Sequence, residues 1–335
     1  MKACYPRWAR DEGAALTVVL TMLAIMSMLA VVVVDAANMG VRRTSNLVRM
    51  EQTRWYLMGA EAFAASQLGE LRRRAGTSRV DESEWQGQPF VFPLDDGSME
   101  VELWDGGNCL NLNSMVVTDD GGGRFVSPGG LVQFARLLDA VDVGQQQTGL
   151  GAALVDWLDS DSHAMAGGAE DGAYAGEGRA YVAANALLAD ISELGNVRGF
   201  TSSIVDAIAP YACVRPTSAP NVINPNTLRP EQAPLLAMAI DGLRIERAAQ
   251  IIRDRPRGGW ETIDDFLRHP ALSEFELNEA GRAQFSLQTR YFVLRAEVVR
   301  VGSRENSAVL LEDGGSGNAA VVRRVFGAGG GKNLL

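Results

Sequence analysis

The sequence predicts an α+β protein in which a long N-terminal helix precedes a sheet, and a helical domain is inserted between the strands of that sheet. Three observations lead to this fold class. Residues 14–34 form an uncharged apolar run, residues 90–104 and 289–326 have strand composition, and residues 131–267 between them show helical spacing. The 335 residues provide for a membrane anchor and two domains of ordinary size.

Composition narrows the classes of function. The chain is 47% hydrophobic and 21% charged, which favours a globular body. Its net charge of -10 repels nucleic acid and anionic lipid, so we expect any bound ion to be a cation. The two histidines, His163 and His269, and three cysteines are too few for a zinc cluster and offer little general-base chemistry. Since neither a phosphate-binding loop nor a nucleophile motif appears, we expect no enzyme activity.

The apolar run at residues 14–34, AALTVVLTMLAIMSMLAVVVV, is long enough to span a membrane. About 20 residues at about 1.5 Å each cross a hydrocarbon core of about 30 Å. Lys2, Arg7 and Arg10 precede the run, which favours a cytoplasmic N-terminus and an external remainder. A cleavable secretory signal is the alternative, although its apolar core typically has about 7–15 residues.

The same helix is predicted to continue beyond the membrane to about Arg74, for a length of about 90 Å. No proline lies between Pro6 and Pro89 to break it, although two separate helices remain an alternative. Apolar residues recur every seven positions, which predicts a stripe that contacts either a partner helix or the protein's own sheet. The stripe consists of Val41, Val48, Trp55 and Ala62.

Strands are expected on both sides of the helical region. Residues 90–94 and 99–104 flank an Asp-Gly turn signal and predict a β-hairpin. Residues 289–302 are rich in β-branched and aromatic side chains, and two further strands follow within residues 307–326. Helical segments are expected at residues 131–141, 150–161, 187–197 and 200–214.

Residues 221–267 predict a helix-hairpin-helix. One helix ends at the turn Asp241-Gly242-Leu243, a second spans Ile245 to Arg253, and Thr262 with Asp265 forms a capping-box-like start for a third. Such hairpins often bind DNA, so a membrane-anchored DNA-binding or uptake module is an alternative function. An acidic chain outside the cytoplasm argues against it. The arginines available for such a surface are Arg229, Arg244, Arg247, Arg253, Arg255 and Arg257.

An acidic cluster lies within residues 156–171 and consists of Asp156, Asp159, Asp161, Glu170 and Asp171. An EF-hand pattern counted from Asp159 fails at its sixth position, where Ala164 replaces glycine. Carboxylate oxygens on this glycine-containing loop are still suitable ligands for calcium, and a solvated acidic loop is the alternative. A secreted calcium-dependent enzyme would require a mature protein that lacks residues 14–34.

The junction Arg10-Asp11-Glu12-Gly13-Ala14, followed at once by the apolar run, resembles the type IV prepilin signal. That resemblance implies that a prepilin peptidase cuts between Gly13 and Ala14 and methylates the new N-terminus. Most pilins have glutamate at mature position five, where this chain has Val18. With this departure and its strand–helix–strand layout, nearly the whole chain resembles the GspK family, the minor pseudopilins of type II secretion systems.

The resemblance implies a pilin-like sheet and an inserted domain with two SAM-like parts. The implied division is a leader at 1–13, a transmembrane helix at 14–34, the periplasmic part of the spine helix at 35–75, the first part of the pilin-like domain at 76–118, SAM-like parts at 119–215 and 216–283, C-terminal strands at 284–326 and a flexible tail at 327–335.

Sites, partners and location also follow from the resemblance. It implies calcium in the helical domain, with Asp159, Asp161, Glu170 and Asp171 as candidate ligands. Cys109 and Cys213 stand at places like those of GspK cysteines, so a disulfide is expected outside the cytosol, with two buried thiols as the alternative.

The implied role is structural: a single-pass inner-membrane protein whose periplasmic head caps the pseudopilus tip and supports export of folded proteins across the outer membrane. The implied partners are GspI- and GspJ-type minor pseudopilins, the prepilin peptidase and the inner-membrane secretion platform.

Overall fold

The computed structural model describes residues 12–75, 85–143, 149–176, 181–314 and 319–327. It contains one long helix, an antiparallel sheet and a set of short helices, so the predicted α+β class is confirmed. Contacts within the chain separate two units, residues 1–56 and residues 57–335. The predicted leader falls largely outside the described residues, as does the predicted tail beyond residue 327.

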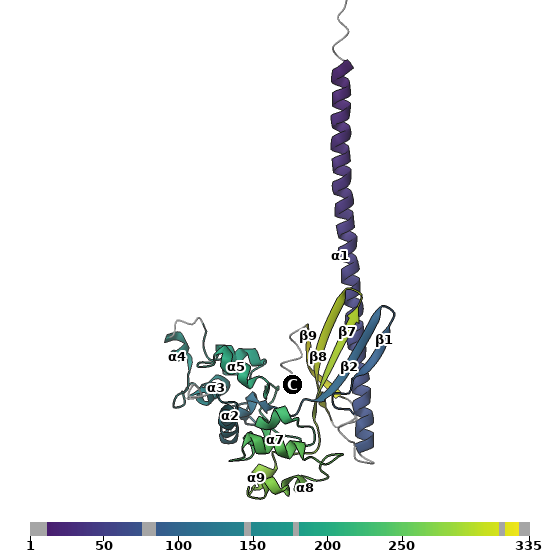
Figure 1. Ribbon diagram of the computed structural model, residues 1–335. Helices are drawn as coiled ribbons and strands as arrows, with labels where there is room; N and C mark the ends of the chain where they lie inside the picture. Colours follow the sequence, from purple (N-terminus) through teal and green to yellow (C-terminus); the bar gives the residue numbers. More distant parts are fainter. Residues whose placement is uncertain (1–11, 76–84, 144–148, 177–180, 315–318, 328–335) are drawn as a thin grey trace, which may run out of the picture. The chain divides into compact units, whose positions relative to one another are not determined.

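Helix α1 spans Glu12–Ala75 as one uninterrupted helix (Figure 1). Every side chain of residues 14–34 is exposed, and an 18-residue window within this part has a mean hydropathy of 2.7. The hydroxyls of Thr17, Thr21 and Ser27 donate hydrogen bonds to carbonyl oxygens three or four residues earlier. The polar groups inside the apolar run are therefore satisfied within the helix, as a hydrocarbon environment requires.

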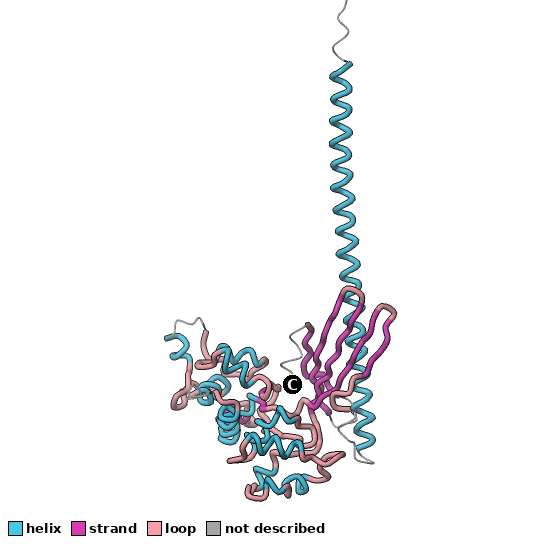
Figure 2. The backbone as a smooth tube through the Cα atoms, viewed as in Figure 1, coloured by secondary structure: helices cyan, strands magenta, loops and turns pink. Residues whose placement is uncertain are grey.

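Five antiparallel strands form one sheet (Figure 2), and their order is β1-β2-β7-β8-β9 (Figure 1). Strands β1 and β2 form the predicted hairpin, and β2 pairs along its whole length with β7, which follows it only after the helical region. The strands are β1 Phe90–Leu94, β2 Gly97–Asp105, β7 Tyr291–Arg300, β8 Ser303–Asp313 and β9 Ala319–Phe326.

Within the second unit, the C-terminal part of α1 packs on this sheet. The Phe63 ring lies edge-on to Phe90 and Phe92 of β1, with ring centroids 5.4 and 5.0 Å apart. At the opposite edge of the sheet, the guanidinium of Arg324 in β9 donates to both carboxylate oxygens of the nearly buried Glu61. Contacts at both sheet edges thus hold the helix.

The buried face of α1 differs from the predicted apolar stripe. In the second unit the buried apolar positions of α1 are Leu57, Ala60, Ala64 and Leu68. The stripe residue Ala62 is exposed, as is Met58 beside it. The interpretation of the stripe as sheet packing is therefore wrong at these positions. A seven-residue repeat drifts by about 20° per repeat around a straight helix, so it did not mark the face that the sheet covers. The other stripe residues, Val41, Val48 and Trp55, are exposed too.

The chain leaves the sheet after Asp105 at the end of β2 and returns at Tyr291, where β7 begins beside β2. The insertion is larger than the predicted residues 119–283, because Leu110, Leu112 and Phe285 all belong to its core. Its helices are α2 Pro128–Ala140, α3 Leu150–Leu158, α4 Asp171–Gly176, α5 Ser202–Ile208, α6 Ala233–Ala239, α7 Ile245–Arg253, α8 Ile263–Leu267 and α9 Glu279–Arg282. Its 3-10 turns are η2 Leu112–Met115, η4 Ile191–Asn196, η5 Pro230–Gln232 and η6 Pro270–Leu272, and its short strands are β3 Leu110–Asn111, β4 Val116–Thr118, β5 Arg124–Val126 and β6 Ala212–Cys213.

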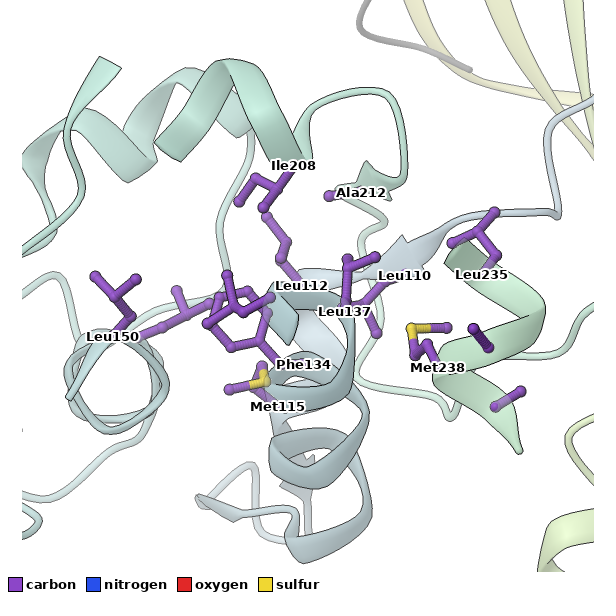
Figure 3. Packing of buried hydrophobic residues seen from close by; sticks show 14 of the residues in the cluster. Leu110, Leu112, Met115, Phe134, Leu137, Leu150, Ile208, Ala212, Leu235 and Met238 are labelled. Carbon is purple, nitrogen blue, oxygen red and sulfur yellow. The ribbon is translucent and has the colours of Figure 1, made fainter. Parts of the chain in front are cut away.

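One continuous hydrophobic core holds the insertion together (Figure 3). Phe134 and Leu137 of α2 are fully buried between residues from distant parts of the chain, including Leu150 of α3 and Leu235 of α6. Burying a large apolar side chain contributes about 1.5–3 kcal/mol, so this shared core joins the two predicted SAM-like parts into one domain.

A buried carboxylate joins the insertion to the sheet. The Asp105 side chain at the end of β2 accepts hydrogen bonds from the hydroxyls of Thr227 and Thr289, each at 2.6 Å. Burial raises the pKa of Asp105, while those hydroxyls and the nearby Arg215 oppose the rise. The insertion is also tied to β9, where Arg323 pairs with Asp190.

Candidate functional site

The acidic cluster of the insertion lies where α3 ends and a glycine-containing loop begins. Asp159 is the C-cap of α3 and has extended backbone geometry, so the chain turns away from the helix axis there. The loop passes Asp161, returns through Gly167 and Gly168, and reaches Glu170 just before α4. Helix α3 is itself buried along most of its length, which gives the loop a rigid base.

Three of the four predicted ligand residues come together. One carboxylate oxygen from each of Asp159, Asp161 and Glu170 lies within 4.8 Å of the other two. Asp159 and Glu170 are nearly buried, at 5% and 7% exposure, whereas Asp161 is exposed. The fourth predicted residue, Asp171, is used differently: its carboxylate accepts the amide hydrogen of Ala183 at 3.1 Å.

The buried oxygens of this cluster lack donors. Within the part of the chain that the structure describes, neither carboxylate oxygen of Glu170 nor Oδ1 of Asp159 has a hydrogen-bond partner. A buried ionised carboxylate without a partner is strongly unfavourable. The arrangement therefore suits a hard cation, which would take these oxygens as ligands and neutralise their charge.

Burial and neighbouring negative charge raise the pKa values of two carboxylates in the cluster. Burial, together with the negative charges of Asp156 and Asp159, raises the pKa of Glu170 to about 7. Burial also raises the pKa of Asp159 to about 6, with Asp161 and Asp156 adding to the effect. Glu170 and Asp159 thus resist ionisation chiefly because they are buried, and the negative charges of their neighbours add to the effect. A bound cation would reverse this preference.

Asp156 belongs to the acidic run but is absent from the predicted ligand set. It is fully buried in the last turn of α3, and its carboxylate accepts the amide hydrogens of Met165 and Ala169. The signal in the sequence was its spacing of three residues from Asp159, which places both side chains on one side of the helix.

Cys109 and Cys213 form a disulfide with their Cα atoms 5.7 Å apart. Two short strands bring them together, because β3 and β6 pair in parallel with Leu110 opposite Ala212. The bridge closes a segment with a sequence separation of 104 within the insertion. In the chain-entropy model a loop of about 100 residues contributes about 4.7 kcal/mol to stability.

The predicted processing site lies at the start of α1. The described chain begins at Glu12, so Gly13 and Ala14 fall in the first turn of the helix. Val18, the residue at the predicted mature position five, is exposed one turn further along. Its apolar side chain carries no charge, unlike the glutamate that most pilins have at this position.

The helix-hairpin-helix region is present as α6 and α7, but at least four of its six arginines make contacts within the protein. Arg247 pairs with Glu274 and Arg244 with Glu246. Arg255 donates to the carbonyl oxygens of Pro225 and Leu228. Arg229 lies over the Trp104 ring and is half-buried. These contacts compete with phosphate binding and do not support the DNA-binding alternative.

Comparison with known proteins gives a consistent result. Two family models described as "Type II secretion system (T2SS), protein K" match residues 108–217 and 223–288. A protein named type II secretion system protein K from Pectobacterium carotovorum is 31% identical over 326 residues, covering 95% of this chain and 97% of the relative. One of the same name from Pseudomonas aeruginosa is 28% identical, covering 96% and 94%.

A solved structure matches as well. A chain in the crystal structure of the GspK–GspI–GspJ complex from the enterotoxigenic Escherichia coli type 2 secretion system aligns with a TM-score of 0.72 and 26% identity. The alignment covers 85% of this chain and 99% of that chain. The similarity therefore extends over the sheet and the insertion together.

The raised pKa values predict that the carboxylate cluster destabilises the metal-free protein as the pH rises. Folding raises the pKa of Glu170 from 4.5 to about 7. Its stabilising contribution is therefore fully present below about pH 4.5 and is lost as the pH rises through about 7. In EDTA, we expect the unfolding midpoint of the wild type, relative to that of Glu170→Gln, to fall by at least about 2 °C between pH 5 and pH 8.

Glu170→Gln is the matched comparison because it keeps the shape of the side chain and cannot ionise. Thermal unfolding of both full-length proteins in the same detergent gives the difference at each pH. Midpoints that change in parallel from pH 5 to pH 8 would show that Glu170 does not carry this pH dependence.

Proposed function

Because the chain belongs to the type II secretion system protein K family, we propose that it is a minor pseudopilin that caps the tip of the periplasmic pseudopilus. In this position it supports export of folded proteins across the outer membrane. The observation that carries the proposal is the combination of an exposed apolar helix, residues 14–34, with a pilin-like sheet that holds a large insertion between β2 and β7.

The insertion favours a terminal position in the fibre. Residues 106–290 leave and rejoin the sheet between two neighbouring strands, so they add bulk to the head without altering strand pairing. Subunits within a helical shaft have neighbours on every side, whereas a subunit at the tip has neighbours on one side only. Val18 fits the same position, because a tip subunit need not offer a carboxylate to the amine of a subunit above it.

The exposed stripe on α1 supports helix-mediated assembly. Val41, Val48 and Trp55 lie beyond the membrane span and are 69%, 52% and 68% exposed. Apolar side chains in a line on a helix favour contact with another helix. We take the occupants to be GspI- and GspJ-type minor pseudopilins, since the similar solved chain comes from a complex of that composition.

The same proposal gives the orientation and the processing partners. Positive charge ahead of the span favours a cytoplasmic N-terminus and a periplasmic head. A prepilin peptidase would cut between Gly13 and Ala14 and methylate Ala14. The inner-membrane secretion platform would then extract the processed helix for assembly.

Calcium is the cation that we propose for the carboxylate cluster. Calcium takes six to eight oxygen ligands, and Asp159, Asp161 and Glu170 each offer one carboxylate oxygen here. Backbone carbonyls or water would complete the shell. Asp171 was proposed from the sequence as a further ligand, but its hydrogen bond to Ala183 makes it a secondary candidate.

Position in the fibre is tested by labelling. Cells that overproduce the major pseudopilin form long fibres, and an epitope tag after Leu335 allows this chain to be located on them by immunogold microscopy. We expect gold at one end of each fibre and loss of secretion when the chain is deleted. A tagged major pseudopilin, which should label the whole shaft, is the control. Gold along the shaft from this chain would contradict the tip position.

Processing is tested by intact mass and N-terminal sequencing of the protein from membranes, with and without the peptidase. We expect a chain that starts at methylated Ala14. Gly13→Leu should remain uncut because a large side chain occupies the cleavage position, whereas Gly40→Ala, which meets no neighbouring atom, should be cut normally. A start near Ala37, or an uncut Met1 in the presence of the peptidase, would contradict pseudopilin processing.

Calcium binding is tested by calorimetric titration of the full-length protein in detergent. We expect a dissociation constant of about 10⁻⁵–10⁻³ M for the wild type. Glu170→Gln should weaken binding at least about 10-fold, since it removes a buried ligand charge. Asp120→Asn, which removes an exposed charge elsewhere in the insertion, should bind like the wild type. Equal affinity for all three proteins would rule out the cluster as the site.

A further inference from the structure

We infer that Asp156 is a positioning residue for the carboxylate cluster, holding the loop between Asp159 and Glu170 in the conformation in which the three carboxylates meet. The inference rests on the proposed calcium site and deepens it. It assigns a role to a buried carboxylate that the candidate ligand set leaves out.

The hydrogen bonds of Asp156 reach both arms of the loop. The amide of Met165, on the outgoing arm, donates to the two carboxylate oxygens at 3.0 and 3.2 Å. The amide of Ala169, on the returning arm, donates to the same carboxylate. Because Ala169 directly precedes Glu170, this contact sets where the Glu170 side chain begins. One fixed side chain on α3 thus determines the course of the whole loop.

The loop passes so close to Asp156 that a side chain is excluded. A Cβ atom built on Gly168 would lie 1.9 Å from Oδ2 of Asp156. The neighbouring Gly167 has a φ of +84°, a conformation that favours glycine. Its carbonyl oxygen would lie 2.6 Å from a Cβ on Gly149, which precedes α3. These close approaches leave the loop little freedom once Asp156 is in place.

Asp156 and Glu170 therefore differ in role: Asp156 holds the loop, and Glu170 is a candidate cation ligand. The oxygens of Asp156 already accept amide hydrogens, whereas both oxygens of Glu170 have no donor among the described residues. Groups that orient metal ligands in this way typically change metal affinity by about 10–100-fold when they are altered. Asp156 also adds a negative charge near the cation without giving up its hydrogen bonds.

Gly168→Ala tests this role without removing any carboxylate. The added methyl group must displace the Asp156 side chain, so we expect calcium affinity to fall by about 10–100-fold in calorimetric titration of the full-length protein. Gly172→Ala is the matched control, because a Cβ there meets nothing within 4 Å. It should bind calcium within about twofold of the wild type. Unchanged affinity for Gly168→Ala would overturn the inference.

A double-mutant cycle separates positioning through Asp156 from a general need for glycine. Asp156→Ala alone should also weaken calcium binding, and it opens space for a methyl group at residue 168. Adding Gly168→Ala to Asp156→Ala should then cost little further affinity, because the contact through which it acts is gone. Additive losses would show that Gly168 acts by another route and would overturn the inference.

Thermal unfolding in EDTA checks that each variant is folded before titration. If Gly168→Ala does not fold, Asp156→Asn, which keeps one acceptor oxygen, takes its place and should show an intermediate loss of affinity. If the wild type itself binds no calcium, the proposed calcium site falls and this inference falls with it. If the wild type binds and Asp156→Ala binds equally well, the inference alone fails.

Discussion

The head depends on one constraint. After leaving β2, the chain must form a complete domain and then return as β7, the strand that pairs with β2. Residues 106–290 separate β2 from β7, yet the two strands pair along their full length. Asp105 stands at this junction and accepts hydrogen bonds from Thr227 inside the insertion and from Thr289 just before β7. One carboxylate therefore links the end of β2, the insertion and the residues just before β7. Bringing the ends of so long a segment together costs conformational entropy. The Cys109–Cys213 disulfide lowers this cost because it already restricts the unfolded chain.

Local patterns in the sequence predicted local structure well. The apolar run marks α1, the Asp-Gly signal marks the β1–β2 hairpin, and Thr262 caps α8 by accepting the amide of Asp265. These features depend on neighbouring residues, whose preferences act without tertiary context. The extra strands Leu110–Asn111 and Ala212–Cys213 could not be predicted in this way, because their parallel pairing joins residues about 100 positions apart. Within residues 187–197 the structure has a 3-10 turn at Ile191–Asn196 instead of the expected α-helix.

The candidate site shows the same limit. An acidic run was visible in the sequence, but its members separate only in three dimensions. Asp159, Asp161 and Glu170 converge, Asp171 turns to Ala183, and Asp156 binds loop amides. Which oxygen lacks a donor depends on the path of the loop, and that path depends on close backbone contacts at Gly149 and Gly168. The interpretation of the α1 stripe as packing on the protein's own sheet failed for a related reason, since a repeat identifies apolar positions without showing which of them the sheet covers.

Because the insertion begins and ends on neighbouring strands, it lies outside the mechanical path through the head. A pull along α1 passes to the sheet through the packing of Leu57, Ala60 and Ala64 and through the Glu61–Arg324 pair. Tension is then shared among strands whose hydrogen bonds resist shear together, while the insertion branches from one end of β2 and β7 and is tied to β9 by the Arg323–Asp190 pair. Tension on such a subunit would thus strain its spine and sheet first and the inserted domain least.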